Sequence, residues 1–299
     1  MKIHEPENFQ TEIVDEIKDK IALGEMTYKE KCFLNGIIRQ TQPKKILELG
    51  VSAGGSSAVI LNAIKDFDNA RLYSIDYNEK WHHDKTKQAG FIIDENFAHF
   101  KDNWQLYLGG TAARFIEKIG GEIDICLIDT VHSNPGEFLD LLMVLPYLKK
   151  NAVIILHDTC YHAWKNDRGG GCRNSYTNGV LFSCIKGKKL TFNENYFHQY
   201  ANIGAIVLDE LQDDKMFDYL YLLTLPWFYL PTDTDILECQ NLFKKNYGDE
   251  FADKFLKIAL YNKELYLEFK KNERRKKGVK NKLIGLIPSR KIRQQLRKE

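Results

Sequence analysis

The chain has 299 residues, of which 43% are hydrophobic and 12% aromatic, enough for one large or two modest packed domains. No apolar run approaches the ~20 residues that cross a bilayer as a helix, and the first residues do not resemble a secretory signal. Six scattered cysteines without a Cys-x-x-Cys pair exclude a disulfide framework and a cysteine zinc site, so we expect a cytoplasmic protein.

The net charge of +2 conceals a strong polarity along the chain. Residues 270–299 contain 13 of the 43 Lys and Arg residues but only 2 of the 41 acidic ones, so the remainder is acidic overall. A basic segment of this kind typically meets phosphate on lipid headgroups or nucleic acid, although a solvated, frayed helix has the same composition. Apolar residues alternate with charges after residue 282, which favours peripheral contact of residues 271–299 with the inner face of an anionic membrane.

Strand and helix patterns alternate through the middle of the chain. Residues 1–42 have helical apolar spacing, residues 43–209 alternate, and residues 210–270 are predicted to form a helical appendage before the basic tail 271–299, in which 272–282 resembles a polybasic linker. The predicted strands lie near 44–50, 71–76, 104–109, 123–129, 151–157 and 203–208, and the predicted helices of the alternating section lie near 56–67, 111–119 and 135–149. This order predicts a doubly wound, mostly parallel, Rossmann-like α/β sheet.

A glycine-rich loop joins the first predicted strand to a helix. Residues 45–57 read Lys-Ile-Leu-Glu-Leu-Gly-Val-Ser-Ala-Gly-Gly-Ser-Ser, and such a loop brings backbone N–H groups close to a ligand. The second strand ends in Asp76, where a carboxylate can accept the hydroxyls of a ribose. The spacing of Gly50, Gly54 and Gly55 matches neither the dinucleotide fingerprint nor a P-loop. A plain tight turn remains an alternative, but the pair of features predicts a nucleoside-binding βαβ unit.

Carboxylates and imidazoles follow the fourth and fifth predicted strands. Asp129 and His132 come after one strand, and His157 and Asp158 come at the end of the next. Because ligands of open α/β sheets bind at the carboxyl ends of strands, we expect these side chains at one rim. Two carboxylates can hold a hard cation, and His132 is placed to take a proton. Alternatively, Asp129 caps the following helix and His157 only orients Asp158.

The E-x-G-x-x-x-G loop with its acidic second strand end resembles the class I S-adenosylmethionine-dependent methyltransferases. The D-x-x-H and H-D pair resembles the subgroup that methylates sugar or macrolide hydroxyls, and the resemblance covers about residues 40–210. It implies S-adenosyl-L-methionine as cofactor, Mg²⁺ on Asp129 and Asp158, and His132 as general base. Catechol-type relatives have Asn after the second Asp, where this chain has Thr159, so the third ligand is not identified. The implied cofactor-binding residues are Glu48, Gly50, Ser52, Gly54, Asp76, Gly110, Thr111 and Asp129.

This resemblance implies an O-methyltransferase that acts on a sugar hydroxyl. The helical section and the basic tail also resemble those of bacterial proteins that build surface glycans, which implies a role in glycan assembly. Three alternatives stay open: a non-catalytic scaffold docked through the basic tail, a hydroxylase on the same fold, and a nucleic-acid methyltransferase. Against a nucleic-acid methyltransferase, the chain lacks the Asn/Asp-Pro-Pro-Tyr/Phe motif of base methylation, and the residues before the basic tail are acidic overall. The His82-His83-Asp84 cluster is predicted to be surface polar residues, and the loop around 169–171 a lid or acceptor-binding segment.

Overall fold

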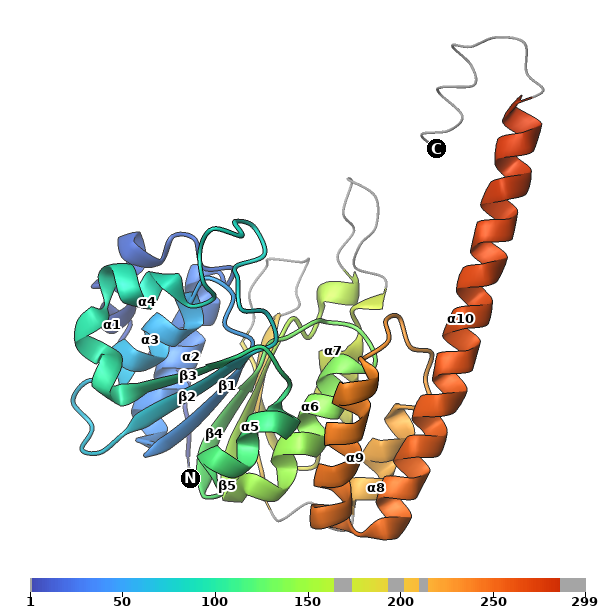
Figure 1. Ribbon diagram of the computed structural model, residues 1–299. Coiled ribbons are helices and arrows are strands. Elements are labelled where there is room, and N and C mark those ends of the chain that lie inside the picture. Colours follow the sequence, from blue (N-terminus) through green and yellow to red (C-terminus); the bar gives the residue numbers. More distant parts are fainter. Residues whose placement is uncertain (1, 164–173, 193–201, 210–214, 286–299) are drawn as a thin grey trace.

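A single sheet forms the centre of the computed structural model, which describes residues 2–163, 174–192, 202–209 and 215–285 (Figure 1). The strands in these residues are β1 (Lys45–Leu49), β2 (Arg71–Asp76), β3 (Trp104–Leu108), β4 (Ile123–Ile128), β5 (Leu148–His157), β6 (Lys188–Leu190) and β7 (Ile203–Val207). Their spatial order is β3-β2-β1-β4-β5-β7-β6. Neighbours from β3 through β5 pair in parallel, whereas β7 pairs antiparallel with β5 and β6. The predicted mostly parallel α/β sheet is confirmed.

Helices cover both faces of the sheet (Figure 1). One face carries α1 (Glu12–Asp15), α2 (Tyr28–Thr41), α3 (Gly55–Ala63) and α4 (Phe91–Asn96); the other carries α5 (Ala112–Ile119), α6 (Gly136–Val144), α7 (Thr177–Cys184), α8 (Met216–Leu222), α9 (Asp233–Tyr247) and α10 (Asp249–Gly285). Short 3-10 helices are η1 (Pro6–Asn8), η2 (Lys18–Ile21), η3 (Ala98–Asn103), η4 (Leu145–Tyr147) and η5 (Tyr161–Ala163). Successive strand residues point to opposite faces, so Ile46 joins the core under α3 and Leu47 the core under α6.

Short elements account for most differences from the sequence-based prediction. Helices α4 and α7 and strand β6 were not predicted, because six, eight and three residues are too few for a clear apolar period. The helix predicted over 135–149 is also shorter: α6 ends at Val144, and η4, which contains Pro146, leads into β5. A proline inside a helix removes a backbone hydrogen bond, which favours this early end. The glycine loop 169–171 lies outside the described residues.

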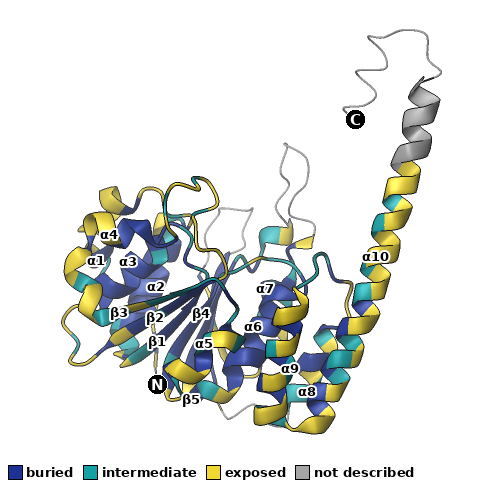
Figure 2. Cartoon of the chain, viewed as in Figure 1, coloured by how far each residue is buried: buried dark blue, intermediate teal, exposed yellow. Residues whose placement is uncertain are grey.

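The long helix α10 extends well beyond the sheet and its covering helices (Figure 1). Its first turns pack Phe251 and Phe255 into the core, whereas Figure 2 shows mostly exposed residues along its outer part. The stretch 272–282 is part of this helix, so the predicted linker was wrong. Lys and Arg are good helix formers, which accounts for the difference. Among the described residues, no helix has the length and apolarity to span a membrane; residues 286–299 lie outside them.

Candidate active site

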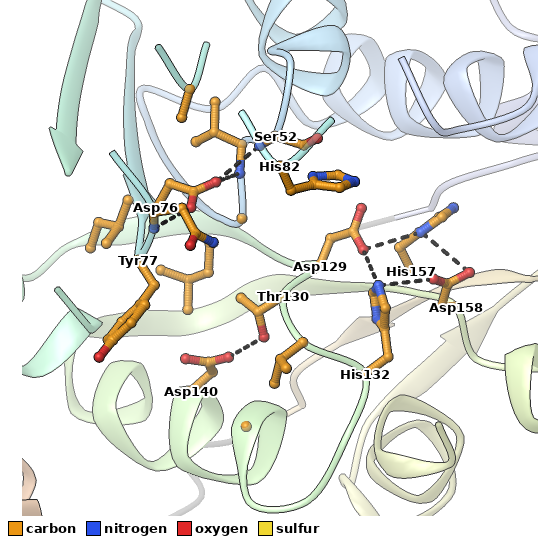
Figure 3. Close-up of a pocket in the computed structure, with 18 of the residues that line it drawn as sticks. Ser52, Asp76, Tyr77, His82, Asp129, Thr130, His132, Asp140, His157 and Asp158 are labelled. Carbon is orange, nitrogen blue, oxygen red and sulfur yellow. Dashed lines mark hydrogen bonds and ion pairs between the residues drawn. The ribbon is translucent and has the colours of Figure 1, made fainter. Parts of the chain in front are cut away.

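A cavity of about 990 Å³ opens at the carboxyl ends of the parallel strands (Figure 3). Most of the predicted site residues line it: Gly50, Ser52, Asp76, Gly110, Thr111, Asp129, His132 and Asp158. Two further groups come from outside the predicted methyltransferase segment, namely Glu25, Met26, Thr27 and Glu30 before and in α2, and Tyr229, Leu230, Pro231, Asp235 and Cys239 before and in α9. The cavity is therefore built by three parts of the chain.

The loop between β1 and α3 is fixed by the carboxylate at the end of β2. The backbone N–H groups of Val51 and Ser52 both donate to Asp76 Oδ2 at 2.9 Å, and that of Asn78 donates to Oδ1 at 2.7 Å. A carboxylate has about four acceptor positions, so Asp76 can hold the loop and still accept a hydroxyl. Gly50 has φ +88°, and a Cβ there would lie 1.8 Å from the carbonyl oxygen of Asp129. Only glycine allows this close approach.

Two side-chain hydroxyl groups lie at this cavity. The side-chain oxygens of Ser52 and Thr111 are buried, and neither has a hydrogen-bond partner among the described residues. Both residues line the cavity. Buried polar groups are normally satisfied, so these hydroxyls fit a polar cofactor held between the β1 and β3 loops, as expected for S-adenosylmethionine.

Glu48 and Gly54, both expected to bind the cofactor, are not among the residues that line the cavity. Glu48 is fully buried, and its carboxylate accepts hydrogen bonds of 2.6 Å from Ser56, Ser57 and Ser74. It therefore ties β1 to α3 and β2 beneath the loop. Gly54 has φ +99°, and a Cβ there would lie 3.1 Å from the Cα of Gly90. These two residues shape the loop from behind.

Glu48 gives the stability of the protein a pH dependence that can be measured. Burial raises its pKa from 4.5 to about 7, although the three serine hydroxyls lower it. The folded state therefore keeps a proton that the unfolded chain releases between these values, and the free energy of unfolding falls as the pH rises through this window, by roughly 3 kcal/mol from this group. Urea denaturation of Glu48→Gln, which cannot titrate, should lack this loss. Parallel pH curves for the two proteins would contradict the assignment.

Asp129, His132, His157 and Asp158 form one cluster at the rim, as predicted (Figure 3). His132 Nε2 lies 3.1 Å from Asp158 Oδ2 and 3.8 Å from Asp129 Oδ1. His157 Nδ1 lies 3.2 Å from Asp129 Oδ1 and 3.6 Å from Asp158 Oδ1. On its other side, His157 Nε2 lies 3.3 Å from Glu30 Oε2. His157 is buried between three carboxylates, so it orients both aspartates rather than Asp158 alone.

The charges of this cluster are strongly coupled. Burial opposes the charge on His132, but Glu137, Asp129 and Asp158 raise its pKa to about 9. Burial likewise opposes the charge on His157, whose pKa the two aspartates raise well above its usual value. Burial alone would raise the pKa of Asp129, but the two imidazolium groups lower it; for Asp158 burial prevails and the pKa is raised. The neighbouring carboxylates therefore favour the cationic form of both histidines.

The cluster also fits a divalent cation. Ligand atoms of Asp129, His132 and Asp158 all lie within 4.8 Å of one another. Thr159 is buried and does not line the cavity, so it supplies no third ligand. The third potential ligand of this cluster is His132. Its Nε2 can either bind a metal ion or accept a proton, but not both at once.

Asp140 was missed by the sequence analysis although it lines the cavity. It lies in α6 and accepts a hydrogen bond of 2.6 Å from the hydroxyl of Thr130. Burial raises its pKa to about 7. The available signal was a single carboxylate inside the apolar run Phe-Leu-Asp-Leu-Leu of residues 138–142. Its position gives the cavity a further buried carboxyl group, separate from the rim cluster.

The parallel sheet, the fixed glycine loop and the acidic β2 end define a nucleoside-binding Rossmann-like domain. Residues 47–159 match a family model described as "Methyltransferase domain". This part of the chain is thus a methyltransferase domain by its match to that model.

Solved structures with similar folds include the O-methyltransferase TomG from Streptomyces achromogenes, in complex with SAM (14% identity, 69% of this chain and 99% of that chain, TM-score 0.47). Another is an O-methyltransferase from Bacillus cereus in complex with SAH (17% identity, 66% of this chain and 90% of that chain, TM-score 0.47). A third is a methyltransferase from Podospora anserina bound to SAH (14% identity, 66% of this chain and 87% of that chain, TM-score 0.48). Among curated proteins, no significant sequence match was found.

Proposed function

We propose that the protein is an O-methyltransferase whose acceptor is a hydroxyl group of a sugar, within the assembly of bacterial surface glycans. The cluster of Asp129, His132 and Asp158 carries this proposal, because it places a proton acceptor between two carboxylates at the edge of the cofactor cavity. The cavity of about 990 Å³ lies at the upper end of the roughly 300–1,000 Å³ common for ligand sites. It therefore has room for an acceptor beside the cofactor.

The residues divide the work between binding and proton transfer. When bound, S-adenosylmethionine supplies an electrophilic methyl group. The β1 loop and Asp76 hold the nucleoside, and His132, once neutral, accepts the proton of the acceptor hydroxyl at Nε2. Asp158 and Asp129 then stabilise the imidazolium that forms, and Glu137 holds the other side of the ring, with its Oε1 3.5 Å from Nδ1. Mg²⁺ would be held by Asp129 and Asp158, where it would make a bound hydroxyl more acidic.

Transfer of a labelled methyl group tests the proposal. The full chain is incubated with methyl-labelled S-adenosylmethionine and a set of free, nucleotide-linked and lipid-linked sugars, with either Mg²⁺ or EDTA. We expect an oxygen-linked labelled methyl group on at least one sugar. Label on nitrogen or on nucleic acid, or a folded protein that binds the cofactor but methylates no hydroxyl, would contradict it.

We further propose that α10 brings this activity to an anionic membrane surface. Its outer part exposes Tyr261, Leu265 and Phe269, and the stretch 270–276, which contains five Lys or Arg residues and one Glu, follows directly. Apolar side chains beside Lys and Arg favour the interface of anionic lipids. We expect co-flotation of the full chain with vesicles that contain phosphatidylserine, weakened by high salt and by replacing residues 270, 271, 274 and 275 with Gln. Equal flotation with neutral vesicles would contradict the electrostatic part.

A further inference from the structure

Three side chains converge at the mouth of the cavity, outside the rim cluster. Nε2 of His82 lies 3.2 Å from Glu25 Oε1, and Nε2 of His83 lies 3.5 Å from the same oxygen. The two imidazole rings are adjacent, with centroids 4.0 Å apart. All three residues line the cavity, and Figure 3 shows His82 among the lining residues. Side chains of consecutive loop residues usually diverge, so their convergence on one carboxylate calls for an explanation.

The loop that carries the two histidines is held in place by its own contacts. The N–H of Trp81 donates to the carbonyl of Lys87 at 3.0 Å, and that of Ala89 donates to Glu79 at 3.1 Å. The ring of Trp81 packs edge-on against His83, with centroids 5.3 Å apart, and also against Phe91 in α4. The imidazoles therefore lie on a braced turn.

Glu25 is fixed independently, in the turn that precedes α2. Gly24 donates its N–H to the carbonyl of Ile21 at 2.9 Å, and Met26 is buried. Thr27 then begins α2 with a capping box, in which Glu30 accepts a hydrogen bond from the Thr27 N–H at 2.6 Å. The carboxylate and the imidazoles thus come from two segments, each of which has its own backbone hydrogen bonds.

We propose that Glu25, His82 and His83 bind a divalent transition-metal ion, with Zn²⁺ as the representative. Their ligand atoms lie within 4.8 Å of one another. Two imidazoles and one carboxylate are a donor set of open zinc sites, and Fe²⁺ or Ni²⁺ can use the same set, whereas Mg²⁺ prefers oxygen ligands. The side chains are 50%, 49% and 62% exposed, which leaves the remaining coordination positions to water.

The bound ion clamps the mouth of the cavity. It connects the turn before α2 to the loop after β2, two segments whose side chains here are exposed polar groups in contact with one another. Exposed ion pairs contribute little stability by themselves, whereas an ion that binds only the folded state stabilises it in proportion to the logarithm of its concentration over Kd. This site is independent of the proposed methyl transfer to a sugar.

Calorimetric titration of Zn²⁺ into the full, untagged chain after EDTA treatment tests the site. We expect a Zn²⁺ site whose affinity falls by at least about 10–100-fold in each of Glu25→Gln, His82→Ala and His83→Ala, because loss of an outer-shell partner alone has an effect of that size. Zn²⁺ should also raise the melting temperature of the wild type but not of His83→Ala. His99→Ala removes an exposed histidine elsewhere and should bind Zn²⁺ as the wild type does.

Asp158→Asn distinguishes this site from the rim cluster, and it should keep its Zn²⁺. The proposal is overturned if the wild type binds no Zn²⁺, if the three ligand variants bind it unchanged, or if binding is lost in Asp158→Asn. None of these measurements uses S-adenosylmethionine or an acceptor. The Zn²⁺ result can therefore be interpreted even if the protein does not methylate a sugar.

Discussion

Replacing His132 with alanine is expected to lower turnover by about 10²–10⁴-fold and to leave the affinity for S-adenosylmethionine nearly unchanged. His132 Nε2 is the imidazole nitrogen between the two rim aspartates, 3.1 Å from Asp158. Its loss removes the proton acceptor but none of the contacts of the glycine loop. Turnover is measured under saturating cofactor and Kd by calorimetry, with His99→Ala as the matched histidine control. Full activity of His132→Ala would show that another group takes the proton.

The pH profile separates the two possible roles of His132. A base must be neutral, and with a pKa of about 9 only about 1% of the imidazole is neutral at pH 7. Turnover of the wild type without added metal should therefore rise about tenfold per pH unit and level off near pH 9. A cation nearby would lower this pKa, so Mg²⁺ should move the rise to lower pH. A profile that stays flat from pH 7 to 9, or a rise that persists in His132→Ala, is incompatible with the base role.

Replacing Asp76 with alanine should weaken cofactor binding by at least about 10²-fold. The carboxylate accepts three backbone N–H bonds, and bonds to charged groups contribute roughly 1.5–3 kcal/mol each. Their loss frees the loop and removes the proposed acceptor of the ribose, and each 1.4 kcal/mol is a factor of ten in Kd. Calorimetric titration of S-adenosylmethionine measures the effect, alongside circular dichroism to establish that the variant is folded.

Asp76→Asn serves as the graded control. It keeps one acceptor oxygen in the same shape, so we expect an affinity between those of the wild type and Asp76→Ala. A folded Asp76→Ala that binds S-adenosylmethionine as tightly as the wild type would remove Asp76 from the binding site and leave the loop contacts as its only role.

Local pattern was sufficient for the sheet and for the residues at its strand ends. Apolar runs of five or six residues that end in glycine or aspartate are visible without any tertiary information, and Gly50, Asp76, Asp129 and Asp158 all follow or end such runs. Because parallel strands share one carboxyl edge, their terminal residues must meet there. The cluster could therefore be predicted before its distances were known.

The roles of the individual residues at this edge of the sheet could not be predicted from the apolar pattern of the strands. Glu48 lies two residues before Gly50 and was expected to contact the cofactor, yet it faces the three serines beneath the loop. Which way a side chain points depends on the register of β1 against its neighbours and on the packing of α3. The charge state of His132 likewise depends on Glu137, Asp129 and Asp158, whose combined field exists only after folding.

The fold class, the glycine loop and the acidic and imidazole strand ends follow from local pattern, since periodicity and turn residues act over a few neighbouring positions. The residues that close the cavity depend instead on tertiary packing. Glu30 meets His157 across 127 positions, the Tyr77 hydroxyl donates to Asp235 in α9 at 3.1 Å, and Glu25 faces His82 and His83. Contacts between such distant segments depend on how whole helices pack on the sheet, and no local pattern encodes that packing.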